Sequence, residues 1–189
     1  VWHYQTTPAE TWDFTATQPI ILADIEIDGT LRKVLMQAPK NGFFYVLDRT
    51  NGKVISAEPF SNVNWASHVD LETGRPVERP GTRPTGNNVV VIEPGPSGAH
   101  NWNPMAFSPS TGLVYIPALD SRFFWQSDAN FKHVPGLWNL AYDLSIPMDL
   151  SNAGSEQRAR SYLLAWDPVT QREAWRADGS GGGALATAG

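Results

Sequence analysis

The chain has 189 residues, 41% hydrophobic and 17% charged, a balance typical of a globular protein rather than a disordered or membrane-spanning one. Its formal net charge of −5 and its lack of a Lys/Arg cluster argue against a nucleic-acid partner, because neutralising phosphates requires a basic face. Since it has no cysteine, the chain holds no disulfide and no cysteine metal site.

The aromatic and turn-forming residues predict a succession of short strands. Eight Trp, eight Phe and five Tyr accompany 16 Gly and 15 Pro, and large flat side chains favour strands whereas Gly and Pro favour turns. The first four predicted strands are residues 19–27, 33–38, 43–47 and 53–56. Asp28 and Gly29 suit the positive φ angles of a two-residue hairpin turn. The predicted fold class is all-β, with four-stranded antiparallel sheets.

One turn motif recurs along the chain. Its copies stand at intervals of about 60 residues, at residues 48–52, 108–112 and 167–171. The last copy has Gln171 in place of glycine and continues to Trp175. A single copy would be a common type I turn, but recurrence predicts β-propeller blades that lock to their neighbours around a ring. A similar motif at residues 70–74 falls outside this interval and predicts a local hairpin.

Residues 120–160 interrupt the regular pattern. Helical turns fit only two stretches, 138–144 and 155–165, because Pro and Gly divide the rest into loop. Long excursions from a rigid scaffold tend to line or cover a site. We therefore expect this excursion to lie near the functional residues.

Three segments of the chain closely resemble PQQ-dependent alcohol dehydrogenases, in particular their quinohaemoprotein branch. The segments are residues 2–18, 38–52 and 98–102. The resemblance implies that residues 1–189 are part of an eight-bladed quinoprotein propeller, a partial domain truncated at both ends. The propeller axis would hold pyrroloquinoline quinone (PQQ) flat, beside a calcium ion that polarises its reactive carbonyl.

The reaction implied by the resemblance is oxidation of an alcohol to an aldehyde. The alcohol gives its hydroxyl proton to an Asp and its hydride to the quinone, and the electrons leave through a haem c domain or a separate cytochrome c. No Cys-x-x-Cys-His motif occurs here, so a haem domain would lie beyond Gly189. The resemblance also implies a periplasmic enzyme, and we expect no activity from these residues alone.

Three residues are candidates for holding the quinone. The resemblance assigns Lys40 to its ortho-carbonyl oxygens, where a fixed cation stabilises growing negative charge, and it assigns Asn101 and Trp102 to its rim and face. By composition alone, Lys40 would be a solvated turn lysine and Trp102 a core tryptophan. We expect His100 to support Asn101 structurally.

The catalytic base is predicted to lie outside the chain. Asp13 is set aside here, because a lone Asp is often a turn former that hydrogen-bonds its own backbone. Asp167 precedes Trp175 by eight positions, and the same spacing applied to Trp2 places an Asp before Val1. We predict that this upstream Asp is the base and a calcium ligand, and that the chain itself holds no metal ligand.

Two departures from the family fall near the predicted pocket. Asn103 stands where relatives have a His after the Asn-Trp pair, and Ser180 stands where many have a Trp before paired glycines. Loss of that aromatic wall would widen the pocket.

The alternative function is a non-catalytic propeller scaffold that binds partner proteins. A scaffold has no reason to carry Lys40 together with Asn101 and Trp102, so these residues discriminate between the two hypotheses. No glycine-rich nucleotide motif is present, which argues against a nicotinamide or nucleotide cofactor.

Overall fold

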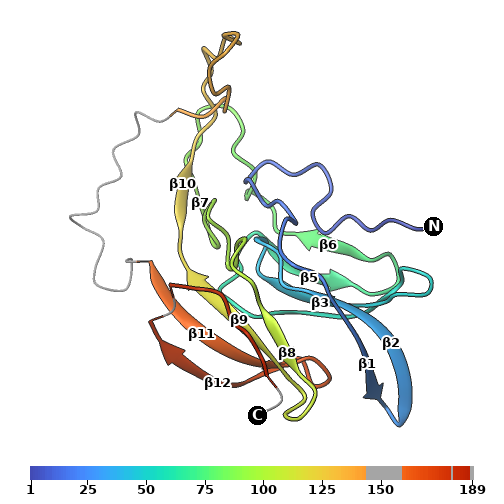
Figure 1. Ribbon diagram of the computed structural model, residues 1–189. Helices are drawn as coiled ribbons and strands as arrows, with labels where there is room; N and C mark the ends of the chain where they lie inside the picture. The colour runs from blue at the N-terminus through green and yellow to red at the C-terminus, as the bar shows by residue number, and fades with distance from the viewer. Residues whose placement is uncertain (144–158, 180, 188–189) are drawn as a thin grey trace.

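The computed structural model describes residues 1–143, 159–179 and 181–187. Its described residues form strands and no helix (Figure 1), and so include no helix able to cross a membrane. The strands are β1 (Ile21–Ile27), β2 (Thr30–Gln37), β3 (Phe43–Asp48), β4 (Val54–Pro59), β5 (Ala66–Asp70), β6 (Arg75–Glu78), β7 (Val90–Ile92), β8 (Ala106–Ser108), β9 (Leu113–Asp120), β10 (Phe123–Trp125), β11 (Arg160–Asp167) and β12 (Arg172–Asp178).

The first sheet is an antiparallel meander in the order β1-β2-β3-β4. At its first turn, Ile27 pairs with Thr30, and Asp28 and Gly29 take φ angles of 52° and 70°, as a type I′ hairpin requires. The four predicted strands are confirmed, with ends that differ by a few residues. The predicted all-β fold with four-stranded antiparallel sheets is thus borne out.

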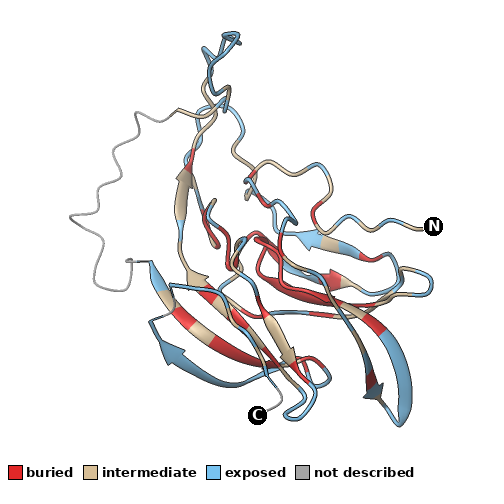
Figure 2. Cartoon of the chain, viewed as in Figure 1, coloured by how far each residue is buried: buried red, intermediate tan, exposed pale blue. Residues whose placement is uncertain are grey.

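Strand β3 lies at the centre of the molecule because both of its faces are covered (Figure 2). Phe44 and Val46 belong to a core shared with the second sheet, whereas Phe43, Tyr45 and Leu47 belong to a core on the opposite face. Successive side chains point to opposite faces of a strand. A continuous apolar run is therefore what a strand buried on both faces requires.

The second sheet has the order β12-β11-β9-β8 and packs against the first sheet. Strands β9 and β11 are adjacent, with Asp120 paired to Arg160, so the chain leaves β9 and returns beside it. In between, β10 pairs with β7 and carries the excursion away from both sheets (Figure 1). The helical turns predicted for 138–144 and 155–165 are wrong for the residues that the structure describes. Residues 160–165 pair as a strand with β9, and residues 138–143 are irregular.

The three copies of the turn motif do not occupy equivalent positions. Residues 48–52 and 167–171 each join the third and fourth strands of a sheet, but 108–112 joins the first and second strands, β8 and β9. The excursion adds residues between β9 and β11 of the second sheet. The interval of about 60 residues between motif copies therefore does not correspond to one turn per blade. The motif at 70–74 closes the β5-β6 hairpin, as predicted.

The two equivalent turns, residues 48–52 and 167–171, are held in place by different side-chain contacts. Trp2 packs on Gly52, where an added Cβ would lie 2.5 Å from the indole, and its Nε1 donates to the Arg49 carbonyl over 3.1 Å. Gln171 takes the place of Gly52 in the second turn, with φ 55°, and its Nε2 donates to Ser56 Oγ over 2.8 Å. The second turn is thus joined to the first sheet by the Gln171–Ser56 hydrogen bond. The first turn is instead held by the packing of Trp2 on Gly52.

Gly98 allows two chain segments to cross closely. A Cβ at this position would lie 2.4, 2.5 and 2.6 Å from Cγ, Cβ and Cα of Lys40, and its φ is +78°. Ala99 N then donates to the Lys40 carbonyl over 3.0 Å. Glycine is required at this crossing both by space and by conformation.

Replacing Gly98 with Ala should destabilise the full-length protein that carries this chain. The left-handed conformation alone costs an L-residue about 1–2 kcal/mol, and the clash with Lys40 adds to it. We expect a loss of at least about 2 kcal/mol of unfolding free energy, seen as a lower thermal midpoint. Gly112→Ala is the matched control, since Gly112 has φ +70° and no atom within 4 Å. Equal losses in the two variants would contradict the close-approach argument.

Exchanging the Ser56–Gln171 hydrogen bond for a Trp–Gly pair should reveal coupling between the sheets. Ser56→Trp alone should overpack against Gln171 and cost about 1–3 kcal/mol, and Gln171→Gly alone loses the hydrogen bond. The double variant should be more stable than the sum of the single effects by about 1 kcal/mol or more, measured by denaturant unfolding. If the two single effects on unfolding free energy simply added, positions 56 and 171 would not pack together as Trp2 and Gly52 do.

Candidate functional site

The buried turn at residues 38–42 forms the base of the candidate site. Asn41 is fully buried, and its Nδ2 donates to the Thr6 carbonyl, to Thr7 Oγ1 and to Tyr45 OH over 3.2, 3.2 and 2.9 Å. Its backbone carbonyl accepts a 2.9 Å hydrogen bond from Trp65 Nε1. Because a buried amide is costly unless it is hydrogen-bonded, these contacts fix the turn and the N-terminal segment together.

Lys40 extends from this turn to an acidic partner. Its side chain is only 10% exposed, so the alternative of a solvated turn lysine is wrong. Its Nζ lies 3.1 Å from Oδ2 of Asp13, whose side chain is 56% exposed. Asp13 has φ 64°, an uncommon conformation for a residue other than glycine. The structure thus places Asp13 beside Lys40, which the sequence interpretation of a self-bonded turn residue did not foresee.

The segment that carries Asn101 runs beside the same turn. His100 is 1% exposed, and its two ring nitrogens lie 2.7 Å from the carbonyl oxygens of Ala38 and Asn103. Burial lowers the pKa of His100, against the opposite effect of the two carbonyl acceptors. The predicted structural role of His100 is confirmed: it ties the Lys40 turn to the loop that carries Asn101.

Asn101 and Trp102 stand at the mouth of a pocket of about 220 Å³. Trp102 is 71% exposed, so the core-tryptophan alternative is wrong. Asn101 is anchored on both sides, since its Nδ2 donates to the Ser97 carbonyl and its Oδ1 accepts from Trp102 N. Gly181 and Gly182 also line this pocket, and Ser180 lies outside the described residues. Neither Lys40 nor Asp13 lines it.

The excursion returns to the segment that holds Asp13. Tyr142 OH donates to the Thr11 carbonyl, and its ring packs in a tilted arrangement against that of Trp125, with the ring centroids 4.2 Å apart. Burial raises the pKa of Tyr142 to about 12, with smaller contributions from the charges of Glu10 and Asp13, so its hydroxyl stays protonated at neutral pH. The excursion thus contacts the segment that carries Asp13, and the expectation that it lies near functional residues stays a prediction.

Lys40 and Trp102 have the chemistry to hold a flat, anionic quinone. Lys40 has three N–H donors, and within the part of the chain that the structure describes its ammonium meets one acceptor, on Asp13. Trp102 offers a large, uncovered ring face for stacking. No group of three or more metal-ligating side chains is present among residues 1–143, 159–179 and 181–187.

Sequence reasoning missed Asp13 and Gly98. The available signal for Asp13 was its place inside the first segment of the family resemblance, and for Gly98 its place just before His100. The predictions for Lys40, Asn101 and Trp102 as quinone contacts stay predictions. The structure does bring the Lys40 turn and the segment of residues 98–101 side by side.

Comparisons with known proteins identify a family that this chain is similar to. A family model described as the glucose/ethanol/alcohol dehydrogenase beta-propeller domain matches residues 1–57. Over its whole length the chain is 52% identical to quinohemoprotein alcohol dehydrogenase ADH IIB from Pseudomonas putida, and the matched region makes up 27% of that protein. It is also 46% identical over its whole length to a 1-butanol dehydrogenase (cytochrome c) from Thauera butanivorans, of which the matched region makes up 28%.

The solved structures show the same relationship in three dimensions. Quinohemoprotein alcohol dehydrogenase ADHIIG from Pseudomonas putida HK5 superposes with a TM-score of 0.88 at 40% identity, covering 100% of this chain and 29% of its own. The chain therefore spans less than a third of the relatives it matches. Because the similarity extends over every part of this chain, in sequence and in the propeller sheets, the chain belongs to the PQQ-dependent alcohol dehydrogenase family.

Proposed function

We propose that the protein carrying this chain oxidises primary alcohols to aldehydes, with PQQ as the hydride acceptor. The observation that carries the proposal is the Asp13–Lys40 pair, in which an exposed carboxylate lies 3.1 Å from a buried ammonium. Asp13 also has a strained backbone, with φ 64°, and backbone strain of this kind clusters at catalytic sites. Support comes from relatives named as alcohol dehydrogenases, whereas a protein-binding scaffold would not need this pair.

Lys40 supplies fixed positive charge in this proposal. When bound, PQQ supplies the carbonyl carbon that accepts hydride. The Lys40 ammonium donates hydrogen bonds to the quinone oxygens, where negative charge develops. Its rigid turn keeps it in place without reorganisation, because Asn41 and the crossing at Gly98 hold the backbone on both sides.

Asp13 serves as the general base in this proposal. Its carboxylate accepts the hydroxyl proton of the alcohol, and the adjacent Lys40 ammonium, 3.1 Å away, orients that carboxylate. We assign the base to Asp13 rather than to an acid before Val1, since Asp13 already lies beside the cation. An additional acid upstream stays a prediction as a calcium ligand.

The remaining parts of the proposal rest on the family. Asn101 and Trp102 would hold the rim and the face of the quinone, and a bound calcium ion would supply polarisation of its reactive carbonyl. Alcohols are the substrates, and a haem c domain or a cytochrome c takes the electrons, as the relatives' names suggest for those proteins. We also propose the periplasm as the location.

Asp13→Asn in the full-length protein should abolish most turnover but keep quinone binding. Asn tolerates the left-handed conformation and has nearly the same shape, but it cannot take a proton. We expect kcat for ethanol, followed by dye reduction with PQQ and calcium present, to fall roughly 10²- to 10⁴-fold. Asp28→Asn is the matched control, because Asp28 is an exposed turn residue with φ 52°.

Two results would contradict this assignment. Full activity of Asp13→Asn would place the base elsewhere, before Val1 as the spacing argument predicts. A wild-type protein that neither binds quinone nor reduces dye with ethanol would favour the scaffold function.

Lys40→Met should weaken quinone binding. The substitution keeps the length and apolar stem of the side chain but removes its hydrogen bonds to the quinone, each worth about 1.5–3 kcal/mol when charged. Titration of the full-length apoprotein with PQQ, read by quinone absorbance, should show roughly 10- to 100-fold lower affinity. Lys53→Met, at an exposed turn position, should bind normally. Unchanged affinity in Lys40→Met would remove Lys40 from the site.

A further inference from the structure

The loop at residues 9–14 is held in a conformation that its residues do not favour. Ala9 and Asp13 both have positive φ angles, 49° and 64°. An L-residue in the left-handed region is disfavoured because its Cβ crowds the following carbonyl oxygen. Such conformations persist only where surrounding contacts determine them. The contacts around this loop therefore control where the Asp13 carboxylate points.

Glu10 binds the backbone on both sides of Asp13. Its Oε1 accepts hydrogen bonds from Trp12 N and, over 2.8 Å, from Phe14 N. These N–H groups belong to the peptide that precedes Trp12 and the peptide that follows Asp13. One carboxylate oxygen thus holds the chain before Trp12 and after Asp13, which restricts the turn that contains the positive φ of Asp13.

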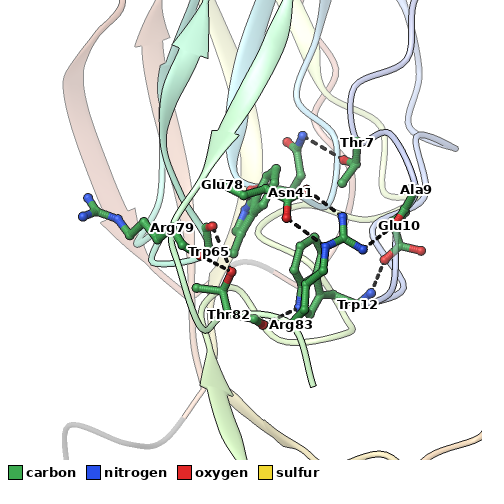
Figure 3. Close-up of polar contacts among 10 residues, drawn as sticks. All are labelled: Thr7, Ala9, Glu10, Trp12, Asn41, Trp65, Glu78, Arg79, Thr82 and Arg83. Carbon is green, nitrogen blue, oxygen red and sulfur yellow. Dashed lines mark hydrogen bonds and ion pairs between the residues drawn. The ribbon is translucent and has the colours of Figure 1, made fainter. Parts of the chain in front are cut away.

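Arg83 fixes the other end of the same loop (Figure 3). Its Nη1 donates to the Ala9 carbonyl over 2.6 Å, and its guanidinium lies 4.8 Å above the Trp12 ring. Nε and Nη2 form a bidentate pair with Glu78 at 2.8 and 2.6 Å. Trp12 Nε1 donates to the Thr82 carbonyl over 3.0 Å. The hairpin end at residues 78–83 thus clamps both Ala9 and Trp12.

Glu10 and Arg83 divide their roles although their charges attract. Within the described parts of the chain, the hydrogen bonds of the Arg83 guanidinium go to Glu78 and Ala9, and those of Glu10 go to the loop backbone. Glu10 is therefore a local backbone clamp rather than one half of a surface ion pair.

We infer that Glu10 is a positioning residue that sets the direction of the Asp13 carboxylate, with Arg83 anchoring the loop at Ala9. This inference rests on the proposed function, in which Asp13 takes the proton of the alcohol. Misplacement of a reacting group by about 1 Å can cost roughly 100-fold in rate, so a clamp at this point controls turnover without touching the substrate.

Three substitutions of Glu10 in the full-length protein separate positioning from charge. Glu10→Gln keeps the length and an acceptor oxygen, Glu10→Asp keeps the charge but is one methylene too short to reach both N–H groups, and Glu10→Ala removes both. We expect kcat to fall roughly 10- to 100-fold in the Ala and Asp variants, with KM and PQQ affinity little changed. The Gln variant should keep most of the wild-type kcat. Near-wild-type kcat in Glu10→Ala, or an active Asp variant beside an inactive Gln variant, would overturn the inference.

Amide hydrogen exchange supplies a readout that does not depend on activity. Exchange at Trp12 and Phe14 should be faster in Glu10→Ala than in Glu10→Gln, even without PQQ. If Glu10→Ala fails to fold, the Asp and Gln variants give the same comparison through the two amides. Unchanged exchange in the Ala or Asp variant would overturn the inference.

Asp13→Asn distinguishes failure of the inference from failure of the proposed function. An inactive Asp13→Asn variant beside a fully active Glu10→Ala variant overturns only the role of Glu10. A fully active Asp13→Asn variant overturns the base assignment on which that role rests.

Discussion

The arrangement of the site depends on one buried polar turn, residues 38–42. Such a turn must satisfy all its backbone groups, since an unpaired buried donor or acceptor costs about 1–3 kcal/mol. Its partners come from distant parts of the chain: the Ala38 carbonyl meets His100, the Lys40 carbonyl meets Ala99, and the Asn41 carbonyl meets Trp65. These segments therefore cannot shift independently. The same contacts that make the turn tolerable in the core bring the candidate functional segments together.

The two members of the Asp13–Lys40 pair are held in contrasting ways. Lys40 projects from the buried turn between β2 and β3, whereas Asp13 sits on a surface loop that keeps its conformation through side-chain to backbone hydrogen bonds. A rigid cation beside an exposed carboxylate suits a reaction in which the carboxylate must both accept and release a proton. The exposure of Asp13 leaves room for an alcohol, and Tyr142 brings the excursion to the same loop.

Local patterns predicted the elements that depend on local chemistry. The Asp28-Gly29 hairpin and the apolar run of β3 follow from turn preference and two-sided burial. The features that escaped prediction depend on contacts between distant residues. Residues 160–165 form a strand because β9 supplies its partner, and Gly98 is essential only because Lys40 crosses it. Asp13 was set aside since the sequence did not show that its partner lies 27 positions later.

The locks at the two equivalent turns show how a repeated architecture tolerates sequence change. Where the first turn has Gly52 beneath an indole, the second has Gln171, whose longer side chain occupies the space and reaches Ser56. A tryptophan at position 56 would leave no room for that glutamine, and a glycine at 171 would leave the serine without its partner. Ser56 follows Gly52 by four positions, as Trp175 follows Gln171, so Ser56 stands where the turn motif has tryptophan and Gln171 stands where it has glycine. These two replacements are compatible only together, because the larger side chain at 171 fills the volume that the smaller one at 56 leaves, and the two side chains hydrogen-bond to each other. Regularity in a propeller is thus a property of contacts between blades rather than of single motifs.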